Sequence, residues 1–294
     1  MSAGARLGLG TVQWGLPYGI SNAAGQTQRH EVGAILAEAR AQGVAVLDTA
    51  SLYGEAEAVL GESVLDGFRV VTKTPAFASA NISAAQVEAL TSTFQRSLER
   101  LSCERIYGLL LHRADDLCAP GGDGLVRAME ALKAQGQVSR IGVSVYDGEQ
   151  LDRVLRVFRP DIVQLPLSVL DQRLLRSGHL ELLKRSGVEI HVRSVFLQGL
   201  LLMPVERVPA FFDPVRPLLA RWHTAVAARG LTPTQAALAF VRDLAAVDVV
   251  LVGVENARQL SQCVTDFTSA EPFDGSELAC DDARYVNPMN WEAS

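Results

Sequence analysis

Cysteine is scarce in this sequence, and long apolar runs are absent. The few thiols form no CxxC pair and no histidine stands at ligand spacing from them, which argues against a structural zinc site, so we expect no metal. Scattered thiols are typical of a reducing cytoplasm. Residues 1–6 show no charged-then-apolar signal segment, and no apolar stretch approaches the ~20 residues that span a bilayer. We therefore expect a cytoplasmic protein that does not bind membranes. The four cysteines are Cys103, Cys118, Cys263 and Cys280.

A basic face is also lacking. The formal net charge is -6, with acidic and basic residues interspersed, so the sequence gives no support for a nucleic-acid partner. Apolar residues make up 48% and charged residues 20% of the 294 positions, which is ordinary for a globular protein. The length suits either one large barrel or two smaller domains.

Short apolar runs alternate with helical patterns along the chain, which predicts repeated βα units. Eight such units predict a parallel (β/α)8 TIM barrel, and no linker divides the chain, so we expect a single domain over residues 1–294. A doubly wound sheet is the alternative, but the expected GxGxxG turn does not follow the first apolar run. The expected strands are 7–12, 45–48, 69–73, 106–112, 140–144, 162–165, 189–194 and 247–252. The expected helices are 28–42, one from about 55, 83–101, 124–135, 148–158, 174–186, 213–228, 233–243 and 256–265.

Turn and cap residues agree with these boundaries. Ser83 with Gln86 has the spacing of a capping box, and Thr232 before a proline is a suitable N-cap. Glycines follow three helical runs where a left-handed helix stop is expected, at Gly43, Gly136 and Gly187.

Three successive predicted strands end in an ionisable residue: Asp48, Lys73 and His112. Tyr53 lies in the loop that leaves the strand ending at Asp48. A parallel barrel carries its chemistry at the carboxyl ends of its strands, so we expect these four side chains to converge. Lysine is disfavoured in strands, and a buried lysine needs an anionic partner, which Asp48 supplies. Such a set can donate a proton to a carbonyl oxygen.

The flanking residues carry a resemblance to a known family. Leu47-Asp48-Thr49-Ala50, Tyr53-Gly54, Lys73 and Leu110-Leu111-His112 resemble the catalytic tetrad of the aldo-keto reductases. The resemblance implies an NAD(P)(H)-dependent oxidoreductase that interconverts an aldehyde or ketone, a sugar among the candidates, and its alcohol. It also implies that Tyr53 is the general acid or base, that Lys73 lowers its pKa, that Asp48 pairs with Lys73 and that His112 orients the carbonyl.

The same resemblance implies the cofactor site. Ser144 and Gln164 would hold the nicotinamide carboxamide, although Val145 stands where the family has asparagine. Phe196 would stack on the nicotinamide ring. Arg258, near the start of the last predicted helix, would contact an adenosine 2′-phosphate, so NADP is favoured and NAD stays open. The full set of expected cofactor residues is Thr11, Ser144, Gln164, Phe196, Gln198, Gly199, Leu200, Gly253, Arg258, Gln259 and Gln262.

The expected substrate is a small carbonyl compound. Trp14 and Tyr18, after the first strand, are expected as pocket walls, and the 113–124 loop and an aromatic tail as covers. We expect a monomer or small homo-oligomer. Two other functions stay open: a Schiff-base lyase that uses Lys73, and a non-catalytic regulatory module that keeps the cofactor site. The tail residues are Tyr285, Met289 and Trp291.

Overall fold

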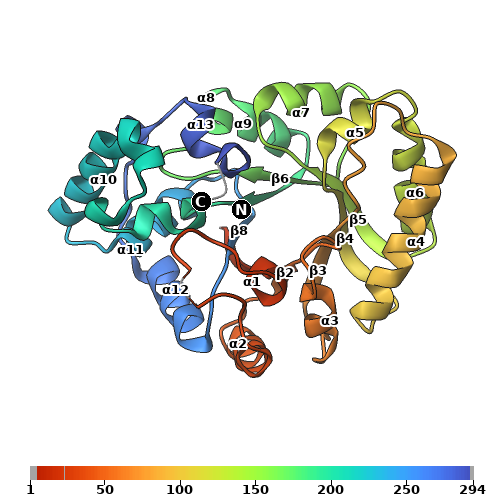
Figure 1. Ribbon diagram of the computed structural model, residues 1–294, viewed down its shortest axis with the longest axis horizontal. Helices are drawn as coiled ribbons and strands as arrows, with labels where there is room; N and C mark the ends of the chain where they lie inside the picture. The colour runs from red at the N-terminus through yellow and green to blue at the C-terminus, as the bar shows by residue number, and fades with distance from the viewer. Residues whose placement is uncertain (1–4, 23, 292–294) are drawn as a thin grey trace.

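The computed structural model describes residues 5–22 and 24–291, so most of the 1–6 segment considered above lies outside the described residues. Eight parallel strands close into a barrel in sequence order, with β1 paired to β8, which confirms the predicted (β/α)8 fold. The helices form a ring outside the strands (Figure 1). The strands are β1 Arg6–Gly10, β2 Val46–Asp48, β3 Arg69–Lys73, β4 Ile106–Leu111, β5 Val138–Ser144, β6 Ile162–Pro166, β7 Glu189–Arg193 and β8 Val249–Val252.

The helices follow the predicted order, with differences at some ends. The expected capping box at Ser83 is present, the expected N-cap Thr232 forms a second capping box with Gln235, and the three expected stop glycines have φ of 72°, 74° and 73°. The α-helices are α1 Val12–Gly15, α2 Arg29–Ala41, α3 Ala56–Gly61, α4 Ala84–Arg100, α5 Ala114–Cys118, α6 Asp123–Ala134, α7 Gly148–Leu155, α8 Arg173–Arg176, α9 His179–Arg185, α10 Arg216–Ala228, α11 Pro233–Arg242, α12 Ala257–Ser269 and α13 Ala283–Val286. Short 3-10 helices are η1 Leu197–Leu202, η2 Val205–Arg207, η3 Ala210–Val215, η4 Ser276–Leu278 and η5 Pro288–Asn290.

The helix expected over 174–186 is the main difference from the predicted elements. The chain instead forms α8 and α9, separated at Gly178, whose φ of 78° is left-handed and ends the first helix. Within the described ranges, no helix is both long and apolar enough to cross a membrane.

Strand register decides which side chains enter the barrel. Parallel neighbours in register point to the same face, and residues two apart along a strand share that face. Gly8 pairs with Val46 and Leu251, and a Cβ at Gly8 would touch the side chains of both, so these residues point inward. The same alternation brings Asp48, two residues after Val46, to the inner face at the carboxyl end of β2. The outward faces of the strands pack against the helices in the main hydrophobic core.

Candidate active site

Asp48, Lys73 and Tyr53 converge inside the carboxyl rim of the barrel. The Lys73 Nζ donates hydrogen bonds to Asp48 Oδ2 at 2.7 Å and to the Thr49 carbonyl at 2.8 Å. It also lies 3.3 Å from the Tyr53 hydroxyl, to which it donates. Lys73 ends β3 and Asp48 ends β2, and the adjacent strands set this spacing. The carboxylate, the ammonium and the phenol therefore form one hydrogen-bonded line.

Lys73 is a buried cation with a compensating partner. Its side chain is 1% exposed and that of Asp48 is 7% exposed. Burial by itself favours the neutral amine and lowers the pKa of Lys73, but the Asp48 carboxylate and the Tyr53 hydroxyl together more than offset this, and the net result is a raised pKa. Asp48 is held on its other side by Gln164, whose Nε2 donates to Asp48 Oδ1 at 2.6 Å. Lys73 therefore stays an ammonium at neutral pH.

Tyr53 is positioned by a close backbone contact. A Cβ at Gly15 would lie 1.8 Å from the Tyr53 carbonyl oxygen, and one at Gly54 would lie 2.4 Å from the Gly15 carbonyl oxygen. Two glycines therefore let the end of α1 pack closely against the loop after β2. Burial raises the pKa of Tyr53, while the Lys73 charge opposes this rise, so the phenol carries its proton at neutral pH.

His112 stands beside the phenol. It follows directly after β4, and its ring meets the Tyr53 ring edge-on, with centroids 5.9 Å apart and an interplanar angle of 86°. Burial, helped by the Lys73 charge, lowers the pKa of His112 to about 4, so the imidazole is neutral at pH 7. Its buried Nδ1 has no hydrogen-bond partner within the described residues. A neutral histidine here can donate one hydrogen bond to an oxygen in the cavity.

A cavity of about 530 Å³ opens from these four residues across the barrel mouth. Most of the expected cofactor residues line it, and so does the expected wall Tyr18. This volume is within the usual range for a bound small molecule. The expected residues that line it are Thr11, Tyr18, Ser144, Gln164, Phe196, Gln198, Gly199, Gly253, Gln259 and Gln262.

Three expected site residues lie elsewhere. Trp14 is fully buried in the hydrophobic core, because α1 starts directly after β1 and packs against α3, so it is not a pocket wall. Leu200 is also fully buried in the core. Arg258 is exposed and does not line the cavity, because the buried face of α12 is set by Leu260, Cys263 and Phe267.

The expected tail cover is divided. Met289 lines the cavity, whereas Tyr285 and Trp291 pack on the Phe212 ring, with centroids 6.5 Å and 4.9 Å away respectively. One residue of the tail therefore reaches the cavity and two anchor the segment to the barrel.

The residues present suit a nicotinamide ring. Gln164 is 0% exposed, and its Oε1 has no hydrogen-bond partner among the described residues, although its Nε2 is bound to Asp48. A buried acceptor without a donor is costly, so the site calls for a ligand N–H such as that of a carboxamide. Ser144 pairs with Gln164 in register and lines the same part of the cavity. The cofactor therefore fits here on the chemistry of the side chains.

The turn after β7 has an unusual backbone. Ser194, Leu197 and Gln198 have φ of 61°, 46° and 53°, in the left-handed region that non-glycine residues avoid. Gly199 follows with φ of 95°, and a Cβ there would lie 1.8 Å from Ser21 Oγ. Such strained segments cluster at ligand-binding sites, and this one lines the cavity.

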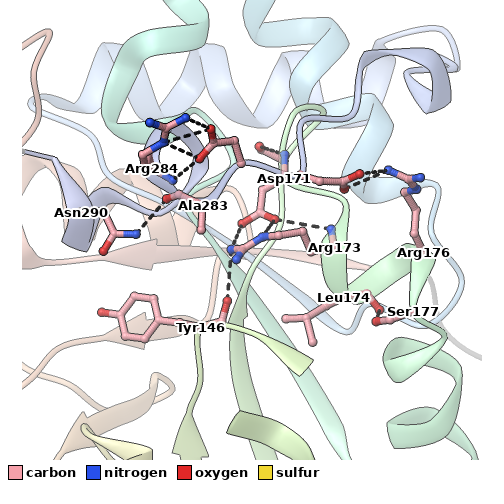
Figure 2. A network of polar contacts seen from close by, with 12 residues as sticks. Tyr146, Asp171, Arg173, Leu174, Arg176, Ser177, Ala283, Arg284 and Asn290 are labelled. Atoms are coloured by element: carbon pink, nitrogen blue, oxygen red, sulfur yellow. Dashed lines mark hydrogen bonds and ion pairs between the residues drawn. The ribbon is translucent and has the colours of Figure 1, made fainter. Parts of the chain in front are cut away.

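Sequence reasoning missed Arg193 and Tyr146, which both line the cavity. Arg193 ends β7 and lies two residues after inward-facing His191, so strand alternation was the signal that identifies it. Figure 2 shows how the Tyr146 backbone is held: Arg173 donates to its carbonyl at 3.2 Å and pairs with buried Asp171. The described part of the chain holds no group of three or more metal-ligating side chains.

The sequence matches the model of the aldo/keto reductase family over residues 6–279. Among solved structures, it resembles an aldo-keto reductase from Bacillus halodurans in its holo form, with 20% identity, a TM-score of 0.73 and coverage of 97% of this chain and 95% of that one. It also resembles the glycerol dehydrogenase from Gluconobacter oxydans, with 19% identity, a TM-score of 0.69 and coverage of 99% and 95% respectively. A search of curated proteins found no match.

The similarity to the two solved structures shows a common barrel. The family match is the stronger finding because it spans all eight strands and every residue of the hydrogen-bonded line at the rim. The chain therefore belongs to the aldo/keto reductase family, the NAD(P)H-dependent oxidoreductases that interconvert carbonyls and alcohols.

Proposed function

We propose that this chain reduces an aldehyde or ketone, or oxidises the matching alcohol, with Tyr53 as the general acid or base. The observation that carries the proposal is the Lys73 ammonium, which lies 3.3 Å from the Tyr53 hydroxyl and 2.7 Å from Asp48. When bound, the nicotinamide cofactor supplies or accepts the hydride. The residues of the chain transfer the proton and stabilise the negative charge on the oxygen.

The proton transfer follows from the charges around the phenol. As a carbonyl oxygen gains negative charge, the Tyr53 hydroxyl is placed to donate its proton to it. The phenolate left behind lies beside the Lys73 ammonium, whose positive charge stabilises it. Asp48 keeps that ammonium charged and in place, and neutral His112 donates a second hydrogen bond to the same oxygen. Donors fixed before the reaction lower its barrier without reorganisation.

Two other functions fit the structure less well. A Schiff-base lyase needs a neutral amine as nucleophile, but the Asp48 carboxylate 2.7 Å from Lys73 keeps the pKa of this lysine raised. A non-catalytic cofactor-binding module would not need the full hydrogen-bonded line at the rim. Multiple-turnover consumption of reduced cofactor with a panel of aldehydes distinguishes the proposed enzyme from such a module.

The cofactor preference is a separate part of the proposal. The described residues place Glu255 in the cavity wall beside α12, with Gln259 Nε2 3.5 Å from its Oε2, whereas Arg258 faces solvent. A carboxylate repels a 2′-phosphate and can accept a hydrogen bond from a ribose hydroxyl. These contacts favour NAD(H), which departs from the NADP preference expected from the sequence.

Tyr53→Phe tests the proposed role of the phenol. The substitution keeps the ring and removes the proton, so we expect turnover to fall at least ~100-fold, the lower range for a positioned general acid. The dissociation constant of the cofactor should stay nearly unchanged. Tyr285→Phe is the matched control, because Tyr285 packs on Phe211 and Phe212 outside the cavity. Turnover near the wild-type rate in Tyr53→Phe, with chemistry rate-limiting, would refute the role.

A further inference from the structure

Arg193 places a second cation in the cavity wall. Lys73 is neutralised by Asp48, but the described residues include no carboxylate within 4.0 Å of Arg193. Arg193 is the last residue of β7. Strand alternation directs its side chain to the inside of the barrel, toward the cavity. The reacting end of the cavity therefore carries an unpaired guanidinium.

This guanidinium is held in place by neutral groups. Its central carbon lies 4.2 Å from the centroid of the Tyr146 ring, a cation–π contact. Its Nη2 donates to the Val145 carbonyl at 3.2 Å, and its Nη1 donates to Ser194 Oγ at 3.3 Å. Arg173 fixes the Tyr146 backbone in turn (Figure 2). The arginine is thus positioned without having its charge cancelled.

The position of Arg193 is next to the residues proposed to hold the carboxamide. Val145, to which it donates, directly follows Ser144, and Arg193 pairs in register with Pro166, two residues after Gln164. Its charge also reaches the tetrad: after burial and Lys73, it further lowers the pKa of His112. Arg193 therefore lines the cavity beside Ser144 and Gln164, and its charge acts on His112.

We propose that Arg193 makes the cavity bind the reduced, uncharged nicotinamide ring more tightly than the oxidised, positively charged ring. The inference rests on the proposed function, because it needs the ring to lie beside Ser144 and Gln164. Like charges repel each other far more in a partly buried site than in water, so a positively charged ring would be disfavoured beside Arg193. The reduced ring carries no charge and avoids this repulsion. At equal concentrations of the two forms, the free enzyme then takes up the reduced cofactor and is poised to reduce a carbonyl.

The test measures dissociation constants of reduced and oxidised cofactor by tryptophan fluorescence quenching or calorimetry. Arg193→Gln removes the charge and keeps a polar side chain, so the oxidised form should bind at least about tenfold tighter relative to the reduced form. Arg193→Lys keeps the charge and should retain most of the wild-type ratio. Arg156→Gln, on an exposed turn after α7, is the control for net charge. Arg193→Met replaces the glutamine variant if that variant does not fold.

Each other outcome overturns the inference. An unchanged ratio in Arg193→Gln shows that the charge does not act on the ring. Equal weakening of both forms shows that Arg193 holds a group common to both, such as a cofactor phosphate. A rise confined to the KM of carboxylate-bearing aldehydes assigns the arginine to the substrate. If the wild type binds neither form, the proposed function fails as well, whereas Tyr53-dependent turnover with an unchanged ratio refutes the Arg193 inference alone.

Discussion

Asp48→Asn is the substitution whose effect follows most directly from the geometry of the rim. The Asp48 carboxylate accepts from Lys73 Nζ through one oxygen and from Gln164 Nε2 through the other. An asparagine offers one acceptor oxygen and one NH₂ donor. Either orientation of the amide therefore points a donor at a donor, and the Lys73 ammonium loses its counter-charge while it stays buried.

The expected loss of stability is large because this pair is shielded from water. Breaking a buried ion pair by removing one partner costs about 3–5 kcal/mol. At roughly 2 °C per kcal/mol for a chain of this size, Tm should fall by about 6–10 °C. Asp281→Asn is the matched control: Asp281 pairs with Arg176, but the two side chains are 69% and 54% exposed. Exposed pairs contribute about 1 kcal/mol or less, so this variant should lose about 2 °C at most.

Asp48→Asn should also change the pH dependence of turnover. Without the carboxylate, burial lowers the pKa of Lys73, and the amine loses its charge at a lower pH than in the wild type. The positive charge that stabilises the Tyr53 phenolate is then lost within the pH range in which turnover is measured. Thermal melts of both aspartate variants and pH–rate profiles of Asp48→Asn check the two effects. Equal Tm losses in the two variants, or an unshifted profile, would show that the buried pair does not act as described.

Two further predictions concern acid stability and cofactor choice. Burial opposes ionisation of Glu189, but hydrogen bonds from His191 and Tyr107 bring its pKa down from 4.5 to about 2, so its ionised form contributes stability that is present above pH 4.5 and lost as the pH falls through 2. Glu189→Gln should therefore flatten the fall in Tm across that window, and a fall as steep as in the wild type contradicts this. Glu255→Gln should tighten NADP(H) relative to NAD(H), whereas Arg258→Ala should leave the ratio of their dissociation constants unchanged. Selective weakening of NADP(H) binding in Arg258→Ala would instead support the contact between Arg258 and the 2′-phosphate that the sequence predicted.

The barrel could be predicted because the alternation of short apolar runs and helical patterns admits few other topologies. Element ends were harder to place. One continuous helix was expected over 174–186 because apolar residues continue at helical spacing on both sides of Gly178. The structure interrupts it there. Gly178 itself was the local signal, and its left-handed φ shows that it ends α8 as the other stop glycines end their helices.

The positions of the expected site residues were predicted correctly where strand ends decide their direction, and wrongly where helix faces decide it. Asp48 and Lys73 follow from the ends of β2 and β3, because the barrel brings strand ends together. Trp14 comes one turn after a strand end, and α1 directs it into the core. Arg258 lies near the start of α12, as expected, but on the face of the helix that is exposed to solvent. The spacing of Leu260 and Cys263 on the buried face indicates this once the limits of the helix are known.

The excess positive charge at the rim of the barrel acts on both the substrate oxygen and the cofactor ring. Lys73 and Arg193 oppose the single carboxylate of Asp48, and His112 is neutral, so the reacting end of the cavity holds one more positive than negative charge. That excess stabilises the negative charge that develops on a carbonyl oxygen as it is reduced. It equally opposes a positively charged nicotinamide ring. A rim of this composition therefore favours both the alkoxide-like transition state and the reduced cofactor, and the Arg193 variants separate the two effects, since turnover and cofactor ratio are measured independently.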